Sequence, residues 1–354
     1  MKRNLLNLTR TGLFLILGLM FFSCATTVNV QLTRPAELDL NGARTVSILP
    51  IKPYAYYKNS GSSIGQQILI ATFYQIFDIK ASDEQLAINT LQSQLERGLI
   101  DSPYIKLVSA DAVQSAIKNG TLNPADVYLT GEISYYNVDD QRRSERKQVK
   151  AATEDEPAEY TIVDRWTRYV YLNFKYQVVD SSTNKIIAYD QYDIKRNSSD
   201  YESKRDLPTA YSLIDSEVKY AANKILKELQ PYVITKSITL LETKTKDKEI
   251  KAQMKAADEL AKNSLLEKAS EEFSRIYKET DLVEAGYNAA ILQEALGNLS
   301  VAERMMLEVY ENHPDSRVSK GLSDIRYEIN QANRLKKQIK AATSDSEDLD
   351  DLDF

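Results

Sequence analysis

The pattern of apolar and polar positions divides the chain into a strand-rich part and a helix-rich part. Residues 126–138 alternate with the period of a β-strand, and Val127, Leu129 and Ile133 share one face. Residues 166–179 alternate in the same way, and residues 186–194 follow them as a hairpin partner. The short β-branched run TVSILPI at residues 45–51 predicts a buried first strand, and residues 105–108 predict another short one.

Helical spacing separates and closes these strands. A helix is expected from Ser82-Asp83 to about Gly98, a second from Asp111 to Gly120, and a third over residues 213–229 before Pro231. Residues 64–79 are apolar and could form a further helix, whereas the charged stretch 139–158 predicts an exposed loop. The order β–α–β–α–β–β–β–α predicts an α/β fold with a mixed sheet and flanking helices.

The last third of the chain is rich in Ala, Glu, Lys and Leu, which favours helices. Residues 285–314 (AGYNAAILQEALGNLSVAERMMLEVYENHP) resemble a tetratricopeptide (TPR) repeat, with a turn at Gly297-Asn298 and the small Ala302 between two helices. A weaker copy precedes it, and a capping helix follows Pro314. The fold class is therefore α/β followed by an all-α TPR-like region. The resemblance implies a partner-binding groove at Tyr287, Ile291 and Glu294, although Tyr287 and Ile291 could simply pack between helices.

The N-terminus has the pattern of an export signal. A cationic start precedes the apolar run Leu13–Phe22, which is too short for a comfortable membrane span, and then come Ser23 and Cys24. The pattern resembles a bacterial lipoprotein signal peptide, although Phe21 stands where Leu is usual. The resemblance implies that Cys24, the only cysteine, is acylated (for example with palmitate) and becomes the mature N-terminus. The alternative is an uncleaved anchor. Ala25 after the cysteine implies transfer to the outer membrane, facing the periplasm.

These observations predict six segments. Residues 1–23 form the signal peptide, 24–42 a tether, 43–230 the α/β periplasmic domain, 231–250 a linker, 251–342 the TPR-like repeats with their cap, and 343–354 an acidic disordered tail. We expected the α/β domain to lie near the membrane and the repeats to reach outward.

The strand motifs also suggest a family. The runs YLTGEIS at residues 128–134 and VVDSSTNKII at residues 178–187 resemble a family of periplasmic lipoproteins. It includes the curli-secretion lipoprotein, the pseudomonad Pel lipoprotein and the outer-membrane activator of penicillin-binding proteins. The resemblance covers about residues 43–230 and rests on structural motifs. In the curli-secretion lipoprotein, related hairpins build an outer-membrane barrel. The charges of residues 139–158 do not suit a lipid-facing strand, so a pore is disfavoured.

The composition argues against several classes of binding and catalytic site. The net charge of −6 argues against a nucleic-acid partner, and the single histidine excludes most histidine-based metal sites and triads. The glycine-rich run at residues 61–65 lacks the Gly-Lys-Ser/Thr ending of a phosphate-binding loop, and no nucleophile motif is present. The sequence therefore predicts no catalytic residue, cofactor or metal. It predicts a lipid-anchored adaptor or scaffold that binds a protein of the cell envelope. The alternative is an oligomeric component of an envelope secretion or transport assembly.

Overall fold

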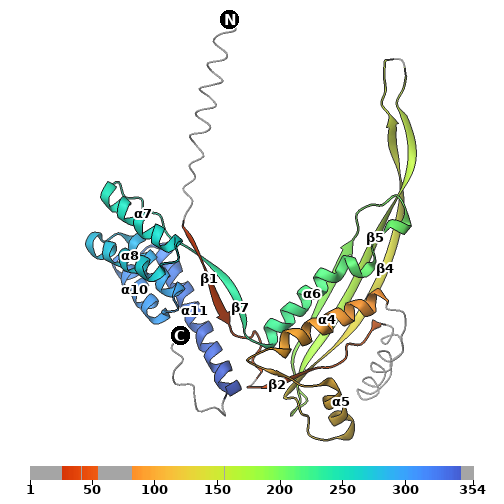
Figure 1. Cartoon of the computed structure of the whole chain (residues 1–354), viewed down its shortest axis with the longest axis horizontal. Helices are drawn as coiled ribbons and strands as arrows, with labels where there is room; N and C mark the ends of the chain where they lie inside the picture. The colour runs from red at the N-terminus through yellow and green to blue at the C-terminus, as the bar shows by residue number, and fades with distance from the viewer. Residues whose placement is uncertain (1–25, 41, 55–81, 155, 344–354) are drawn as a thin grey trace. The chain divides into compact units, whose positions relative to one another are not determined.

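The computed structural model describes residues 26–40, 42–54, 82–154 and 156–343. Cys24, the signal peptide, residues 61–65, the possible helix at 64–79 and residues 344–354 of the acidic tail lie outside the described residues. The described chain is a mixed α/β protein whose C-terminal region is helical (Figure 1). It divides into two compact units. Among these residues, the sheet unit comprises 35–40, 42–54, 82–154, 156–232 and 335–343, and the helical unit comprises 26–34 and 233–334. No described helix combines the length and low charge needed to cross a bilayer.

A five-stranded mixed sheet forms the centre of the sheet unit, in the order β3-β2-β4-β5-β6. Strand β2 (Thr45–Ile48) pairs in parallel with β3 (Lys106–Leu107) and β4 (Val127–Lys150), while β5 (Glu159–Asp180) pairs antiparallel with β4 and β6 (Ile186–Asn197). Helices α4 (Asp83–Ile100), α5 (Ala110–Asn119) and α6 (Ala210–Leu229) complete the order β–α–β–α–β–β–β–α among the described residues. The element order predicted from the sequence is thus confirmed.

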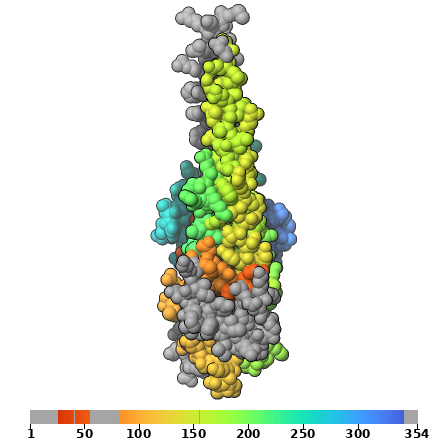
Figure 2. Space-filling model, turned by 90° about the vertical axis from the view of Figure 1, so that its right-hand side faces the viewer, coloured from red at the N-terminus to blue at the C-terminus, as the bar shows by residue number. Residues whose placement is uncertain are grey.

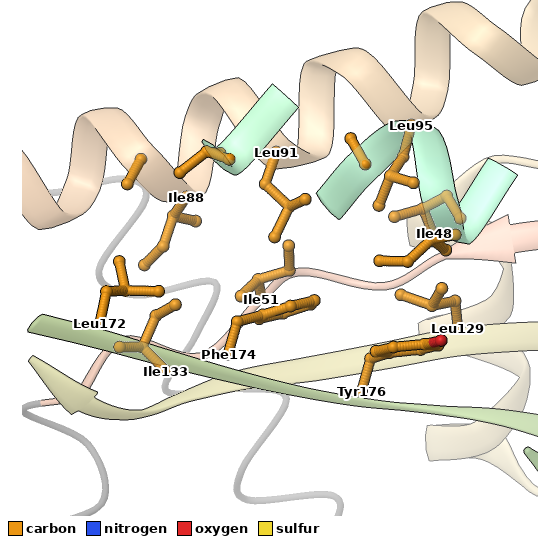
Figure 3. Packing of buried hydrophobic residues seen from close by; sticks show 14 of the residues in the cluster. Ile48, Ile51, Ile88, Leu91, Leu95, Leu129, Ile133, Leu172, Phe174 and Tyr176 are labelled. Atoms are coloured by element: carbon orange, nitrogen blue, oxygen red, sulfur yellow. The ribbon is translucent and has the colours of Figure 1, made fainter. Parts of the chain in front are cut away.

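One face of the sheet carries the main core. Alternate residues of β4 and β5 point toward α4 and α6, so that Leu129, Phe174 and Tyr176 pack under Leu91 and Leu95 (Figure 3). The intervening positions point to the other face. There α5 packs its Val113 against Leu49 and Ala125. The helices therefore cover both faces at the β2 end of the sheet, whereas β4 and β5 continue beyond them.

The prediction of an exposed loop at residues 139–158 is wrong, because most of these residues belong to a β-strand. β4 extends to Lys150 and β5 begins at Glu159, and their register continues without β6 beyond the Tyr169–Asn197 pair. We call residues 141–150 and 159–167 the ribbon (Figures 1 and 2). In the ribbon, ion pairs join the two strands, and apolar residues do not alternate with polar ones. Arg142 contacts Asp164 at 3.1 Å, and Arg165 contacts Glu145 at 2.6 Å.

The tether and linker predictions need correction in a similar way. Residues 27–34 form strand β1 (Thr27–Arg34), which pairs with β7 (Tyr232–Thr239) in a two-stranded sheet. The residues assigned to a tether therefore place a strand inside the helical unit. The physical reason is that each strand finds its backbone partner about two hundred residues away along the chain.

The rest of the helical unit is built from consecutive helices that pack on one another. They are α7 (Lys248–Lys262), α8 (Leu266–Thr280), α9 (Val283–Ala295), α10 (Leu299–Asn312) and α11 (Ser316–Thr343), whose last residues belong to the sheet unit. Gly297 makes the predicted turn with φ of +84°, and Ala302 is fully buried as expected. Val28, Ile238 and Leu240 join the same core, so the β1–β7 pair is part of it.

Candidate interaction surfaces

The three predicted groove residues lie on α9, and the chain itself covers most of that surface. Glu294 is 2% exposed and Ile291 is 5% exposed, while Tyr287 is half-buried and packs beside Gly321 of α11. Ile291 and Glu294 therefore present no open surface to a partner in this structure. The physical reason is that an extended segment of the same chain lies along α9.

That extended segment is the end of β7 and the residues after it. The buried Asn288 side chain forms two hydrogen bonds with the backbone of Leu241. Its Oδ1 accepts from the Leu241 N–H at 2.7 Å, and its Nδ2 donates to the Leu241 carbonyl at 2.9 Å. Lys236 of β7 forms an ion pair with Glu294. A peptide-binding surface on α9 would thus have to release the chain's own strand first.

A cluster of charges anchors this strand pair to the helices. Lys236 lies between Glu294 and Glu328, at 2.8 Å from Glu328 Oε1. Arg34 at the end of β1 makes a two-pronged pair with Glu328, with a distance of 2.8 Å from Nη2 to Oε1. Burial raises the pKa of Glu294. Burial would also raise that of Glu328, but the hydrogen bonds from Arg34 and Lys236 outweigh it and hold the pKa low.

Asp258 on α7 is a partly buried acid that, unlike Glu294 and Glu328, forms no ion pair in the part of the chain that the structure describes. One of its carboxylate oxygens has no hydrogen-bond partner within the described residues, and burial raises the pKa to about 6. In an unfolded chain an Asp titrates near pH 3.9. Between about pH 4 and 6 the unfolded state therefore releases a proton that the folded state retains, so stability should fall as the pH rises through this window.

We expect Asp258→Asn to stabilise the helical unit at neutral pH. Two pKa units would correspond to about 3 kcal/mol, and partial solvent access reduces the expected gain to about 1–2 kcal/mol. Urea unfolding at several pH values should show that the gain disappears at acidic pH. Glu259→Gln is the matched control, because Lys262 lowers the pKa of Glu259 and no gain is expected there. An unchanged pH slope in Asp258→Asn would contradict this assignment.

The base of the ribbon is held rigidly to the sheet unit. Arg168 donates two hydrogen bonds to Asp140, one from Nε at 2.6 Å and one from Nη2 at 2.8 Å. It donates a third hydrogen bond to the Pro208 carbonyl at 2.8 Å. The first of these contacts holds the pKa of Asp140 below its usual range. Tyr201 adds a backbone bridge to Trp166. The ribbon thus leaves the sheet in one fixed direction.

Beyond this base the ribbon is exposed on both faces. Ile162 is 75% exposed, Val149 58% and Tyr160 46%. Arg146 pairs with Ile162 in the register and stacks over the Tyr160 ring at 3.8 Å from its centroid. Exposed aliphatic and aromatic side chains and arginine are common in protein contact surfaces. The sequence interpretation as an exposed loop did not identify these residues.

Comparison with known proteins gives similarity of fold only. No protein-family model and no curated protein matches this chain. Among solved structures, the PelC dodecamer from Paraburkholderia phytofirmans is 15% identical, covers 58% of this chain and 97% of its own, and has a TM-score of 0.23. Lipoprotein GNA1162 from Neisseria meningitidis is 13% identical, covers 51% of this chain and 99% of its own, and has a TM-score of 0.21.

A third structure, protein XCC0632 from Xanthomonas campestris, is 11% identical, covers 56% of this chain and 88% of its own, and has a TM-score of 0.27. A PelC protein and a lipoprotein are therefore among the structures to which this chain has a weak likeness. At these TM-scores the likeness supports no conclusion about activity or partners.

Proposed function

We propose that this protein is a lipid-anchored scaffold of the bacterial cell envelope, which binds other proteins and catalyses no reaction. In this proposal Cys24 carries the lipid, the protein faces the periplasm from the outer membrane, and α7–α10 are TPR-like helix pairs with α11 as their cap. The observation that carries the proposal is the ribbon, because it projects from the sheet with a firmly held base and exposes Ile162, Tyr160 and Val149.

The backbone of the ribbon also supports the proposal that the ribbon binds other proteins. Within the described residues, no strand pairs with the outer edge of β4 beyond its bridge to Lys52 at Glu132. Unpaired N–H and C=O groups along a strand can accept a further strand from a partner. Arg143 and Lys147 of this strand are ion-paired with Asp200 and Glu202. Charged side chains on an edge strand discourage uncontrolled pairing, and a protein partner with an extended segment suits this edge.

A second candidate function is an oligomeric assembly component. The sheet offers a second open edge at β6, since β5 alone pairs with it within the described residues. A sheet with two open edges can join copies of the same chain in a ring, because the edge of one copy meets the edge of the next. Tyr189 of β6 is 56% exposed and adds apolar area there.

Site-specific photo-crosslinking in intact cells tests both functions. A photoreactive residue at Ile162 should give an adduct that mass spectrometry identifies as an envelope protein. The matched control is Tyr220 on α6, which is 58% exposed and lies away from the ribbon, and it should give no such adduct. An adduct at Ile162 containing two copies of this chain supports the oligomer instead. The absence of any adduct at Ile162, in protein that is correctly localised, contradicts the scaffold proposal.

A further inference from the structure

The chain leaves very little length between the predicted lipid site and folded structure. Thr26 is 6% exposed, and its carbonyl accepts a hydrogen bond from the Leu240 N–H at 2.8 Å. β1 begins at the next residue. Two peptide steps separate Cys24 from Thr26, which is at most about 8 Å. If Cys24 is acylated, the helical unit must lie against the bilayer, and the sheet unit follows it in the chain.

Five exposed lysines lie close to this entry point. They are Lys244, Lys246, Lys248, Lys251 and Lys255. Lys244 follows Leu240 by four residues, which reach roughly 14 Å when fully extended. α7, which carries the last three lysines, packs against β1. The lysines therefore lie within a short distance of the predicted lipid.

Three of these lysines form a stripe on α7. Lys248, Lys251 and Lys255 follow the i, i+3, i+7 spacing of one helix face, and the buried residues Met254 and Ala257 lie on the opposite side. None of the five lysines has a carboxylate within ion-pair distance in the described part of the chain. The stripe therefore offers positive charge to the solvent, with Glu259 close enough to Lys255 for electrostatic attraction.

Acidic residues are also present in this region, and their positions leave the stripe basic. Asp247 caps the N-terminus of α7, because its Oδ1 accepts hydrogen bonds from the N–H groups of Glu249 and Ile250 at 2.8 and 3.2 Å. Glu249 and Glu242 lie outside the spacing of the stripe. Glu259, the next position along it, is paired with Lys262 at 2.9 Å.

We propose that Lys244, Lys246 and the α7 stripe dock on the anionic lipid headgroups of the leaflet that holds the acyl chains of Cys24. The inference rests on the proposed lipid anchor for its geometry. A lysine near an anionic bilayer contributes about 1 kcal/mol, so several lysines supplement the anchor. Docking through one face also fixes which side of the helical unit meets the membrane.

The test uses the unlipidated mature chain, residues 25–354, and vesicles of phosphatidylcholine with or without phosphatidylglycerol. The chain should sediment with the phosphatidylglycerol vesicles only, and added salt should release it. The triple variant Lys248→Gln, Lys251→Gln, Lys255→Gln should bind at least about tenfold more weakly. The matched control is Lys336→Gln, Lys337→Gln, Lys340→Gln on α11, which removes the same charge and should bind as the parent chain does.

The outcomes separate this proposal from the lipid anchor. Equal loss in the two triple variants would show attraction by net charge alone and would overturn the proposal, as would an absence of binding to phosphatidylglycerol vesicles. Because no acyl chain is present, a positive result stands even if Cys24 proves not to be lipidated. A negative result leaves the anchor untouched.

Discussion

Replacing Cys24 by alanine should abolish the lipid-mediated, salt-resistant attachment of the mature protein to the membrane. The residue is the only cysteine and directly follows the apolar segment and Ser23, so no second site can take a thioether-linked lipid. Several acyl chains hold a protein firmly, whereas electrostatic attraction by itself is reversible by salt. We expect Cys24→Ala either to appear in the salt-washed soluble periplasmic fraction or to accumulate as the uncleaved precursor.

Fractionation with and without a high-salt wash distinguishes the two contributions to attachment. Ser23→Ala is the matched control, because alanine is as small as serine before the cut and should leave processing intact. If Cys24→Ala is processed normally and still resists the salt wash, the lipid assignment is wrong. The protein would then need a different route to the membrane.

The α/β part of the fold could be predicted because its strands have one buried face. Val127, Leu129 and Ile133 alternate with polar residues, and all three lie in the core under α4 and α6. The helix ends were also marked locally. Ser82 caps α4 through a hydrogen bond from the Gln85 N–H, and Gly120 ends α5 in the left-handed conformation.

The ribbon could not be found by the same reasoning. Both of its faces meet solvent, so neither face needs apolar residues, and its charges look like those of a loop. Arg165–Glu145 and Arg142–Asp164 become visible as ion pairs only when the register is known. Strand β1 did carry a signal, since Val28, Val30 and Leu32 alternate with Thr27 and Asn29. Its partner β7 lies too far along the chain for local pattern to reveal.

The groove prediction placed the partner-binding residues Tyr287, Ile291 and Glu294 on α9. In the structure α9 contacts an extended backbone of the same chain, at Asn288 and Glu294. The prediction could not say that residues 236–241 of the same chain would lie along α9, because the occupant is a strand rather than part of the repeat. The interaction surface was therefore sought on α9, whereas Val149, Tyr160 and Ile162 are exposed on the ribbon.

Replacing Lys236 by methionine should destabilise the helical unit by about 3–5 kcal/mol, because removing one partner of a buried ion pair leaves the other charge uncompensated. Glu294 would lose its cation while it stays 2% exposed, and one of its oxygens already lacks a hydrogen-bond partner among the described residues. Glu328 would keep Arg34 and suffer less. The β1–β7 pair should then detach from α9 and α11 more readily, which hydrogen exchange at Leu240 and Leu241 would report.

The decisive comparison is between single and double variants. Lys236→Met with Glu294→Gln removes both charges, so it should recover much of the loss in thermal and urea unfolding of the full chain. Burial already raises the pKa of Glu294, and loss of Lys236 should raise it further. The single variant should therefore lose less stability at acidic pH, where Glu294 is protonated and neutral in both states, and most at neutral pH. Lys268→Met, at an exposed position on α8, is the matched control and should change little. A loss in Lys236→Met no larger than in this control would mean that the pair does not hold the strands to the helices.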